Sequence, residues 1–153
     1  MGAMLLIKNR KAHFNYEIQK TWNTGIVLMG HEVKSLRLKQ GSLEGAYVKI
    51  LNQEAWIINA RINPYQYAVV ENYDPKKTRK LLLTKKELHQ LIDEIDNKHL
   101  TIVPLEFFLV NNKIKLKIGA GKGKKLFEKR AKIKERDLKR QLGKNFKQSN
   151  LNI

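Results

Sequence analysis

The stretch of sequence that decides the fold lies between residues 100 and 118 and reads Leu100-Thr101-Ile102-Val103-Pro104-Leu105-Glu106-Phe107-Phe108-Leu109-Val110-Asn111-Asn112-Lys113-Ile114-Lys115-Leu116-Lys117-Ile118. Two segments rich in β-branched and aromatic residues flank an Asn-Asn pair, which is typical of a β-hairpin with a two-residue turn. In the second segment Ile114, Leu116 and Ile118 alternate with lysines, so the apolar residues face a core and the lysines face solvent. The hairpin therefore predicts a sheet with a basic stripe on its outer face.

The other strands follow from shorter patterns along the chain. Residues 46–51 and 55–62 flank a short polar link and predict a second hairpin. Residues 14–18 alternate as a half-buried strand. The apolar residues 26–29, which follow Gly25, predict either a further strand or a bulged continuation of the first.

Two helices complete the expected elements. Residues 31–40 predict a short helix that stops at Gly41. The sequence Thr84-Lys85-Lys86-Glu87 is a capping box for an amphipathic helix over about residues 85–97. With about six short strands and no βαβ rhythm, the chain is expected to be mostly β with few helices. Our first choice is an OB-fold-like closed antiparallel barrel (β-barrel) with packed helices, and the alternatives are an SH3-like barrel and a half-open sheet.

Composition divides the chain into three parts. Residues 1–8 are expected to be an N-terminal extension. Met4 is expected to be the natural start, so no structural or functional role is assigned to residues 1–3. Residues 9–120 are expected to form the barrel. Residues 121–153 are expected to form a flexible basic C-terminal tail, disordered alone and helical only when docked on a partner, because they contain too few large apolar side chains to build a core.

The charge of the chain predicts a polyanionic partner. The chain carries 31 Lys/Arg and 14 Asp/Glu, which gives a formal net charge of +17. From residue 119 onward there are twelve Lys/Arg and three acids. Residues 1–118 therefore hold 19 Lys/Arg and 11 acids, so the part expected to fold is basic as well. Such a charge predicts salt-dependent binding to phosphates or anionic lipid, with nucleic acid as the first candidate. A membrane is less favoured, because no apolar run approaches the roughly 20 residues needed to span one. Charge alone leaves open a tail that only keeps the protein soluble.

The sequence lacks the residue patterns that catalysis or metal binding needs. There is no cysteine, which excludes disulfides and thiolate metal sites and is compatible with a cytoplasmic protein. The four histidines have no metal-ligand spacing, and no serine lies in a nucleophile-elbow context. The glycines at positions 119, 121 and 123 resemble a phosphate-binding loop, but Lys125 stands where such a loop needs Ser or Thr, so a hinge is the better interpretation. We therefore expect a binding protein without cofactors or metals rather than an enzyme; a nuclease that uses scattered acids is the weaker alternative.

Several short blocks, taken together and in order, resemble the SsrA-binding protein (small protein B) family, the bacterial partners of transfer-messenger RNA (tmRNA). These blocks are Glu32-Val33-Lys34-Ser35-Leu36-Arg37, Asp74-Pro75, Arg79-Lys80-Leu81-Leu82-Leu83, Lys115-Leu116-Lys117-Ile118-Gly119, Gly121-Lys122-Gly123-Lys124-Lys125, Lys129-Arg130 and Ile133-Lys134-Glu135-Arg136. The resemblance runs from about residue 9 to residue 138 and implies an OB-fold barrel that binds the tRNA-like domain of tmRNA.

The resemblance also implies partners and a mechanism. The protein would act as a monomer, away from membranes, and would deliver tmRNA to stalled ribosomes in trans-translation. Its tail would probe the decoding centre of the small-subunit rRNA and the empty mRNA channel. A ribosome-associated structural RNA-binding protein with a basic extension is the alternative that remains open.

The resemblance assigns roles to individual positions. Those expected to bind tmRNA through the body are Asn9, Arg10, Lys11, Glu32, Lys34, Arg37, Arg79, Lys80 and Leu82. Those expected to bind the ribosome through the tail are Gly121, Lys122, Gly123, Lys124, Lys125, Phe127, Glu128, Lys129, Arg130, Ile133, Lys134 and Arg136. Three positions depart from the family pattern: Glu128 replaces the usual Asp, Phe127 the usual Tyr or His, and Asn23 a frequent Glu. In the tail, Phe127 would be presented for stacking at the decoding nucleotides.

Overall fold

The computed structural model describes residues 3–68, 70–124 and 136–140. The chain forms two compact units, Met1–Gly123 and Lys124–Ile153. In the second unit residues 136–140 are helical and their side chains are exposed. The first unit contains the strands and helices described below.

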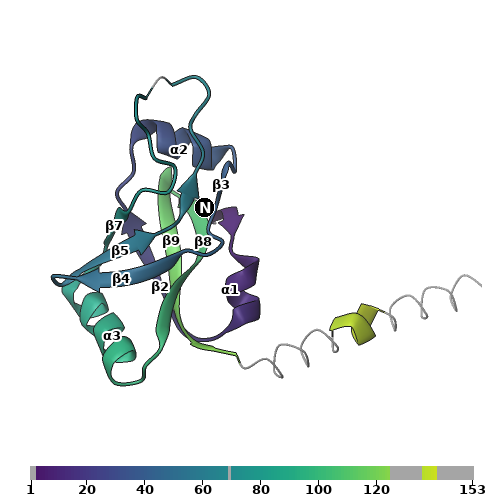
Figure 1. The fold of residues 1–153 in the computed structure, drawn as a ribbon, viewed down its shortest axis with the longest axis vertical. Helices are drawn as coiled ribbons and strands as arrows, with labels where there is room; N and C mark the ends of the chain where they lie inside the picture. The colour runs from purple at the N-terminus through teal and green to yellow at the C-terminus, as the bar shows by residue number, and fades with distance from the viewer. Residues whose placement is uncertain (1–2, 69, 125–135, 141–153) are drawn as a thin grey trace, which may run out of the picture. The chain divides into compact units, whose positions relative to one another are not determined.

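The first unit is built on a seven-stranded antiparallel sheet with the strand order β1-β8-β9-β2-β7-β5-β4 (Figure 1). Its strands are β1 (Met4–Lys8), β2 (Tyr16–Ile26), β4 (Tyr47–Leu51), β5 (Glu54–Ile58), β7 (Arg79–Leu82), β8 (Thr101–Val110) and β9 (Lys113–Gly123). A second, two-stranded sheet pairs β3 (Gly41–Ser42) with β6 (Arg61–Ile62). The helices are α1 (Arg10–Asn15), α2 (Gly30–Arg37) and α3 (Lys85–Asp96).

The expectation of a mostly β chain with few helices is confirmed, but the closed OB-fold-like barrel is wrong. The large sheet is open, because its order ends in β1 on one side and β4 on the other. Within the part of the chain that the structure describes, β1 pairs with β8 and β4 pairs with β5, and no ladder joins the two edges. Closure needs every strand to pair on both sides with a consistent register. The sequence identifies strands but does not show which edges meet.

The hairpin over residues 100–118 is confirmed and extends further than expected. Strands β8 and β9 pair from Val110↔Lys113 down to Thr101↔Gly121. Both turn residues, Asn111 and Asn112, have positive φ angles of 50° and 62°, as a type I′ turn requires. The apolar residues 114, 116 and 118 are buried, and the lysines between them are not. The predicted basic stripe therefore lies on the outer face of β9.

The glycines at positions 119, 121 and 123 do not form a hinge. They continue β9, and Gly121 and Gly123 pair with Ile18 and Tyr16 of β2. A Cβ atom on Gly119 would lie 2.9 Å from side-chain atoms of both Ile18 and Leu105. A Cβ on Gly121 would lie 2.9 Å from Ile18 as well. At positions 119 and 121 glycine is therefore explained by close packing of side chains across the strand, which a sequence pattern does not distinguish from flexibility, whereas a Cβ on Gly123 would meet nothing within 4 Å.

The N-terminal residues are part of the sheet. Residues 4–8, set apart above as an extension, form the edge strand β1. Asn9, expected to contact RNA, caps α1: its Oδ1 accepts a hydrogen bond from the Ala12 N–H at 3.2 Å. Its side-chain amide donates to the carbonyls of Leu43 (3.1 Å) and Pro104 (2.9 Å). The expected strand from residue 14 is corrected as well, because residue 14 still belongs to α1 and β2 begins at Tyr16.

The inner face of the sheet holds the main core. Both expected helices are present, and Thr84 caps α3 by accepting a hydrogen bond from the Glu87 N–H at 3.2 Å. Leu91 of α3 and Leu36 of α2 are fully buried in this core. Trp22 of β2 is also buried, and its indole N–H donates to Gln90 Oε1 of α3 at 3.0 Å. A smaller cluster packs α1 against the sheet; its members are Ala12, Val103, Leu105, Tyr16 and Ile18.

Replacing Gly41 with alanine is expected to lower the free energy of unfolding by about 1–3 kcal/mol. A Cβ at this position would lie 2.6 Å from the backbone carbonyl oxygen of Arg61, so β3 and β6 would have to move apart. The matched control is Gly30→Ala in the first turn of α2, where a Cβ would meet nothing within 4 Å. Urea unfolding of both variants measures the difference, and equal stabilities would contradict the expected clash.

Candidate nucleic-acid interface

A buried ion pair joins α2 to β7. Glu32 lies in the first turn of α2 with its side chain 0% exposed, and Arg79 begins β7 with its side chain 1% exposed. Arg79 Nε donates to Glu32 Oε2 at 2.7 Å, and Arg79 Nη2 lies 2.7 Å from the same oxygen. The other carboxylate oxygen, Oε1, accepts a hydrogen bond from the Met29 N–H at 2.8 Å, which helps to cap the helix. Both residues were expected at the RNA surface, and the structure places them inside the protein.

Arg79 also fixes the loop of residues 63–78, which connects β6 to β7. Its Nη1 donates to the carbonyls of Ala60 (2.8 Å) and Lys77 (3.2 Å). Its Nη2 donates to the Pro75 carbonyl (3.1 Å) and to the Tyr73 hydroxyl (3.0 Å). With the bond from Nε to the carboxylate, the guanidinium makes five hydrogen bonds, which equals its number of N–H donors. The two charges therefore act as a brace inside the fold.

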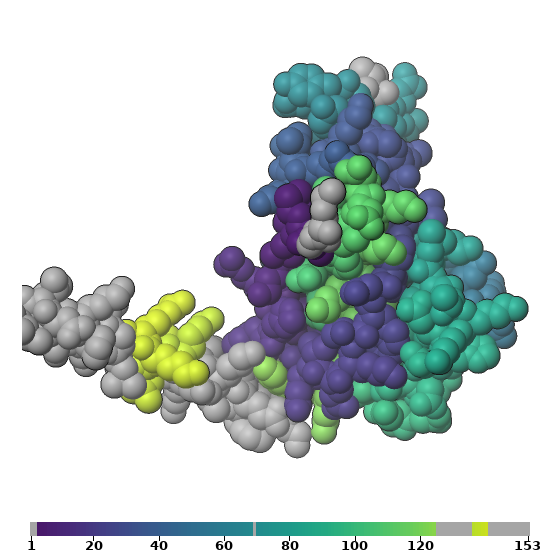
Figure 2. Space-filling model, turned by 180° about the vertical axis from the view of Figure 1, so that it is seen from behind, coloured from purple at the N-terminus to yellow at the C-terminus, as the bar shows by residue number. Residues whose placement is uncertain are grey.

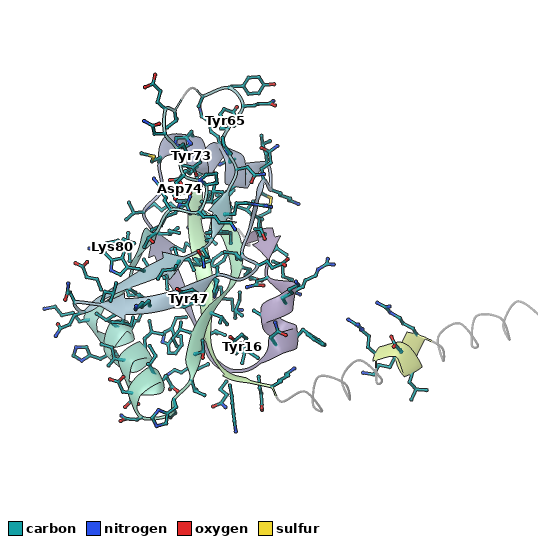
Figure 3. The ribbon with its side chains drawn as sticks, viewed as in Figure 1. Tyr16, Tyr47, Tyr65, Tyr73, Asp74 and Lys80 are labelled. Atoms are coloured by element: carbon teal, nitrogen blue, oxygen red, sulfur yellow. The ribbon has the colours of Figure 1, made fainter. Side chains whose placement is uncertain are left out.

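Tyr73 is the third member of this network. Its hydroxyl lies 2.9 Å from Glu32 Oε2 and 3.0 Å from the Ile62 carbonyl, either of which accepts its proton. Burial, the hydrogen bond to Glu32 and the charge of Glu32 raise the pKa of Tyr73 to about 12, with Arg79 opposing them. Figure 3 shows Tyr73 and Tyr65 in the loop beside α2. Tyr65 and Tyr73 of this loop thus lie beside α2, which carries the exposed Lys34 and Arg37.

The pKa of Glu32 reflects opposing effects. Burial raises the pKa, but the hydrogen bond from Met29 and the charge and hydrogen bonds of Arg79 lower it by more. Tyr73 lowers it further. The pKa of Glu32 in the folded protein therefore lies below its ordinary value, so this carboxylate stays ionised although it is buried.

Acid is expected to destabilise the folded unit through Glu32. Because the folded pKa lies below the ordinary value of 4.5, the ionised carboxylate stabilises the fold above that pH. This contribution is lost as the pH falls through the folded pKa. Urea unfolding of wild type and Glu32→Gln should therefore differ most near neutral pH, and the difference should shrink as the pH falls through the folded pKa of Glu32. A difference that stays constant with pH would contradict this role.

The exposed basic groups around the brace form the first part of the candidate interface. Lys34 and Arg37 are exposed on α2, and the Lys34 ammonium lies 5.6 Å from the centroid of the Tyr65 ring. On β7, Lys80 is partly exposed and pairs with Glu54 at 3.3 Å. Leu82 is 52% exposed on the same strand. These four sequence-predicted residues are accessible to a ligand, unlike Glu32 and Arg79.

The second basic surface is the stripe of β9. Its lysines 113, 115 and 117 lie beside β2, where Lys115 is paired with Gly25 and Lys117 with Asn23. Gly25 is paired in turn with Leu82 of β7, so the stripe continues toward the first group. A groove of about 510 Å³ lies here, lined by Leu82, Gly25, Lys113 and Lys115 among others. Figure 2 shows the green of β9 on the surface next to the violet of β2.

The basic residues of α1 lie apart from these surfaces. Arg10 and Lys11 are exposed, and Lys11 Nζ forms an ion pair with Glu44 Oε1 at 2.6 Å. The hydrogen bond from Lys11 and the positive charge of Lys11 lower the pKa of Glu44. Figure 1 shows α1 and β7 on opposite sides of the first unit. The nine body residues predicted from sequence are thus not gathered into one site.

The tail residues divide at the end of β9. Gly121, Lys122 and Gly123 lie in β9, Lys124 directly follows it, and Arg136 lies in the helical stretch 136–140. Outside the described residues lie Lys125, Phe127, Glu128, Lys129, Arg130, Ile133 and Lys134. Their roles stay predictions.

Sequence reasoning missed Trp56, because most aromatic residues were assigned to the core. In β5 its neighbours Ala55 and Ile57 are buried, whereas Trp56 is partly exposed. Residues 55–58 are all apolar, so the sequence does not show which of them face the core.

Two further searches cover the described residues only. Among them no group of three His, Cys, Asp or Glu side chains is placed to hold a metal ion. None of the helices within this part of the chain has the length and apolar character needed to cross a membrane.

Comparison with known proteins bears on these basic surfaces. The family described as SmpB protein matches residues 6–148 of this chain. The chain belongs to the SmpB family. The SsrA-binding protein of Elusimicrobium minutum is 47% identical over 146 residues, which cover 95% of this chain and 93% of that protein. The SsrA-binding protein of Mesoplasma florum is 45% identical, with coverage of 96% and 99%.

A solved structure adds spatial agreement with the SmpB family. It is described as "tmRNA-SmpB: a journey to the center of the bacterial ribosome", and its matching chain is 38% identical to this one. The TM-score is 0.66, over 78% of this chain and 85% of that chain. The resemblance inferred from short sequence blocks is therefore confirmed at the level of the family.

Proposed function

We propose that this protein is a non-catalytic RNA-binding adaptor that binds the tRNA-like domain of tmRNA and delivers it to stalled ribosomes for trans-translation. The observation that carries this proposal is the near full-length similarity to SsrA-binding proteins, together with the likeness to the chain in the tmRNA–SmpB structure. The net charge of +17 supports an RNA partner on independent grounds. In this role the protein acts in the cytoplasm, where ribosomes are found.

The structure supports a division of labour among the predicted body residues. Buried side chains have no surface to offer to RNA, so Asn9, Glu32 and Arg79 act by holding α1, α2 and the loop of residues 63–78 in place. The exposed residues make the contacts: Arg10 and Lys11 on α1, Lys34 and Arg37 on α2, and Lys80 and Leu82 on β7. The β9 lysines extend this set, because they share an outer face with Leu82.

The tail carries the ribosomal part of the proposal. Residues 126–153 contain nine Lys/Arg against three acids, which suits contact with rRNA phosphates. In this proposal the tail occupies the decoding centre and the empty mRNA channel, where Phe127 stacks on a decoding nucleotide. Small-subunit rRNA is then the second partner.

Filter binding of the full chain tests the RNA-binding proposal. Binding to the tRNA-like domain of tmRNA should be tight and should weaken steeply with salt, while binding to a DNA duplex of equal length should be much weaker. The double variant Lys115→Gln/Lys117→Gln should reduce the salt slope by about two, because two phosphate contacts are lost. The control Lys85→Gln/Lys86→Gln removes the same number of charges from exposed positions of α3. It should reduce the salt slope less than the β9 variant does.

Two results would contradict the proposal. Equal affinity for the RNA and the DNA duplex would favour a general basic protein. Equal effects of the two double variants would show that the β9 stripe is not a specific contact.

A further inference from the structure

A row of three side chains crosses the outer face of β4, β5 and β7. Trp56 of β5 is paired with Lys49 of β4 on one side and with Lys80 of β7 on the other. The three residues therefore lie at the same level of the sheet, with the indole in the middle. Neighbouring strands lie about 4.8 Å apart, so the two lysine Cα atoms flank the indole over a span of about 10 Å.

Burial confirms that this row faces outward. The neighbours Val48, Ala55 and Ile57 are buried in the core, and so is Leu81. Lys49 is exposed, the Lys80 side chain is 40% exposed, and Trp56 is partly exposed. A tryptophan on this face is not needed for the core, since the opposite face of its strand already supplies that packing.

The surroundings of the row are apolar, with one acidic group. Tyr47 and Leu51 of β4 and Leu82 of β7 are all 40% exposed or more on the same face. Glu54 precedes Trp56 on this face and pairs with Lys80 at 3.3 Å. Figure 3 shows Tyr47 on β4 and Lys80 at the side of the sheet. The patch therefore combines a flat ring, flanking cations and an acid that engages one of them.

These features match the chemistry of an unpaired nucleotide. An aromatic side chain on an open sheet face stacks on a base, and flanking lysines contact the phosphates on either side. A duplex keeps its bases stacked on each other and offers no free face to the indole. A lipid surface would need a larger apolar area without an acid such as Glu54 within it.

We propose that Trp56, flanked by Lys49 and Lys80, is a stacking site for an unpaired base of single-stranded RNA. This inference rests on the proposed RNA-binding function and names a contact that the sequence did not assign. Glu54 lowers the affinity of the site by engaging Lys80, so its removal strengthens binding.

The two tryptophans of the chain allow a direct test by fluorescence. Trp22 is buried and its indole N–H is bonded to Gln90, so a ligand at the surface changes the emission of Trp56 alone. The probe is a single-stranded oligoadenylate of about ten nucleotides, which is long enough for one such platform. In the full-length variant Trp22→Phe, the oligoadenylate should quench the remaining emission in a saturable way. A duplex RNA of the same length should not.

Affinity measurements with matched variants separate stacking from charge. Trp56→Ala should weaken oligoadenylate binding about tenfold, whereas Trp56→Phe should keep most of the affinity. Lys49→Gln should reduce the salt slope by about one, and Glu54→Gln should raise the affinity. Circular dichroism melts identify any variant that fails to fold, in which case Trp56→Phe and the quenching titration still decide.

The outcomes distinguish this inference from the proposed function. If Trp22→Phe binds oligoadenylate without a change in emission, or Trp56→Ala binds as tightly as wild type, the stacking site is overturned and the adaptor function stands. If the full chain fails to bind the tRNA-like domain of tmRNA, the proposed function fails, whatever Trp56 does.

Discussion

Replacing Arg79 with methionine is expected to lower the free energy of unfolding by about 3–5 kcal/mol, because it leaves the buried Glu32 carboxylate without its cation. Five hydrogen bonds are lost at the same time, three of them to backbone carbonyls in and near the loop of residues 63–78. Lys77 Nζ lies 3.5 Å from Glu32 Oε1, but Lys77 is partly exposed. It therefore compensates for little of the charge interaction and the hydrogen bonds that are lost with Arg79. Urea unfolding at neutral pH measures the loss.

Arg79→Lys is the more informative variant. It keeps the positive charge but lacks the planar fork, so it satisfies few of the groups that Arg79 now bonds. We expect a stability between those of wild type and Arg79→Met. The loop of residues 63–78 should loosen, which amide exchange measures.

The control for this prediction is Lys80→Met. Lys80 is the next residue along β7, and its ion pair with Glu54 is exposed, so its removal should cost under about 1 kcal/mol. The double variant Glu32→Leu/Arg79→Met should recover much of the loss, because it removes both buried charges. If Arg79→Met costs no more than Lys80→Met, the brace does not exist in solution.

Local signals explain what the sequence predicted well. The Asn-Asn turn and the alternation that follows it depend on neighbouring residues, and both are present in the hairpin of β8 and β9. The same holds for α3, whose capping box involves residues three positions apart. The helix α2 was also expected close to its observed position.

Long-range packing explains the failures. An open sheet and a closed barrel contain the same strands, and they differ only in whether β1 and β4 meet. The glycines of residues 119–123 were taken for a hinge, because the side chains that pack against Gly119 and Gly121 come from β2 and β8, which are distant in the sequence. Both errors concern partners that are distant along the chain.

The candidate site shows the same limit for charged residues. Glu32 and Arg79 lie 47 positions apart in the sequence, and each is of a charged residue type that usually lies at the surface. Only their meeting across α2 and β7 makes burial possible. Lys34, Arg37, Lys80 and Leu82 are exposed in the same blocks, so the blocks contained both kinds of role.

Deleting residues 126–153 is expected to leave the first unit folded and to abolish peptide tagging on stalled ribosomes. The compact unit ends at Gly123, whose ladder partner Tyr16 is retained in the truncated chain. The core residues of that unit all precede the deletion. Its melting temperature should therefore change little, as circular dichroism would show. Binding to the tRNA-like domain should persist with a smaller salt slope, since nine Lys/Arg are removed.

A scrambled tail separates charge from sequence. A chain that carries residues 126–153 in shuffled order keeps the composition and net charge, so it should restore the salt slope of RNA binding. It should not restore tagging, because the order of Phe127 and the basic residues behind it is lost. Tagging by the scrambled chain would show that the tail acts by charge alone. Unfolding of the truncated chain would instead show that the first unit depends on the tail, against the division at Gly123.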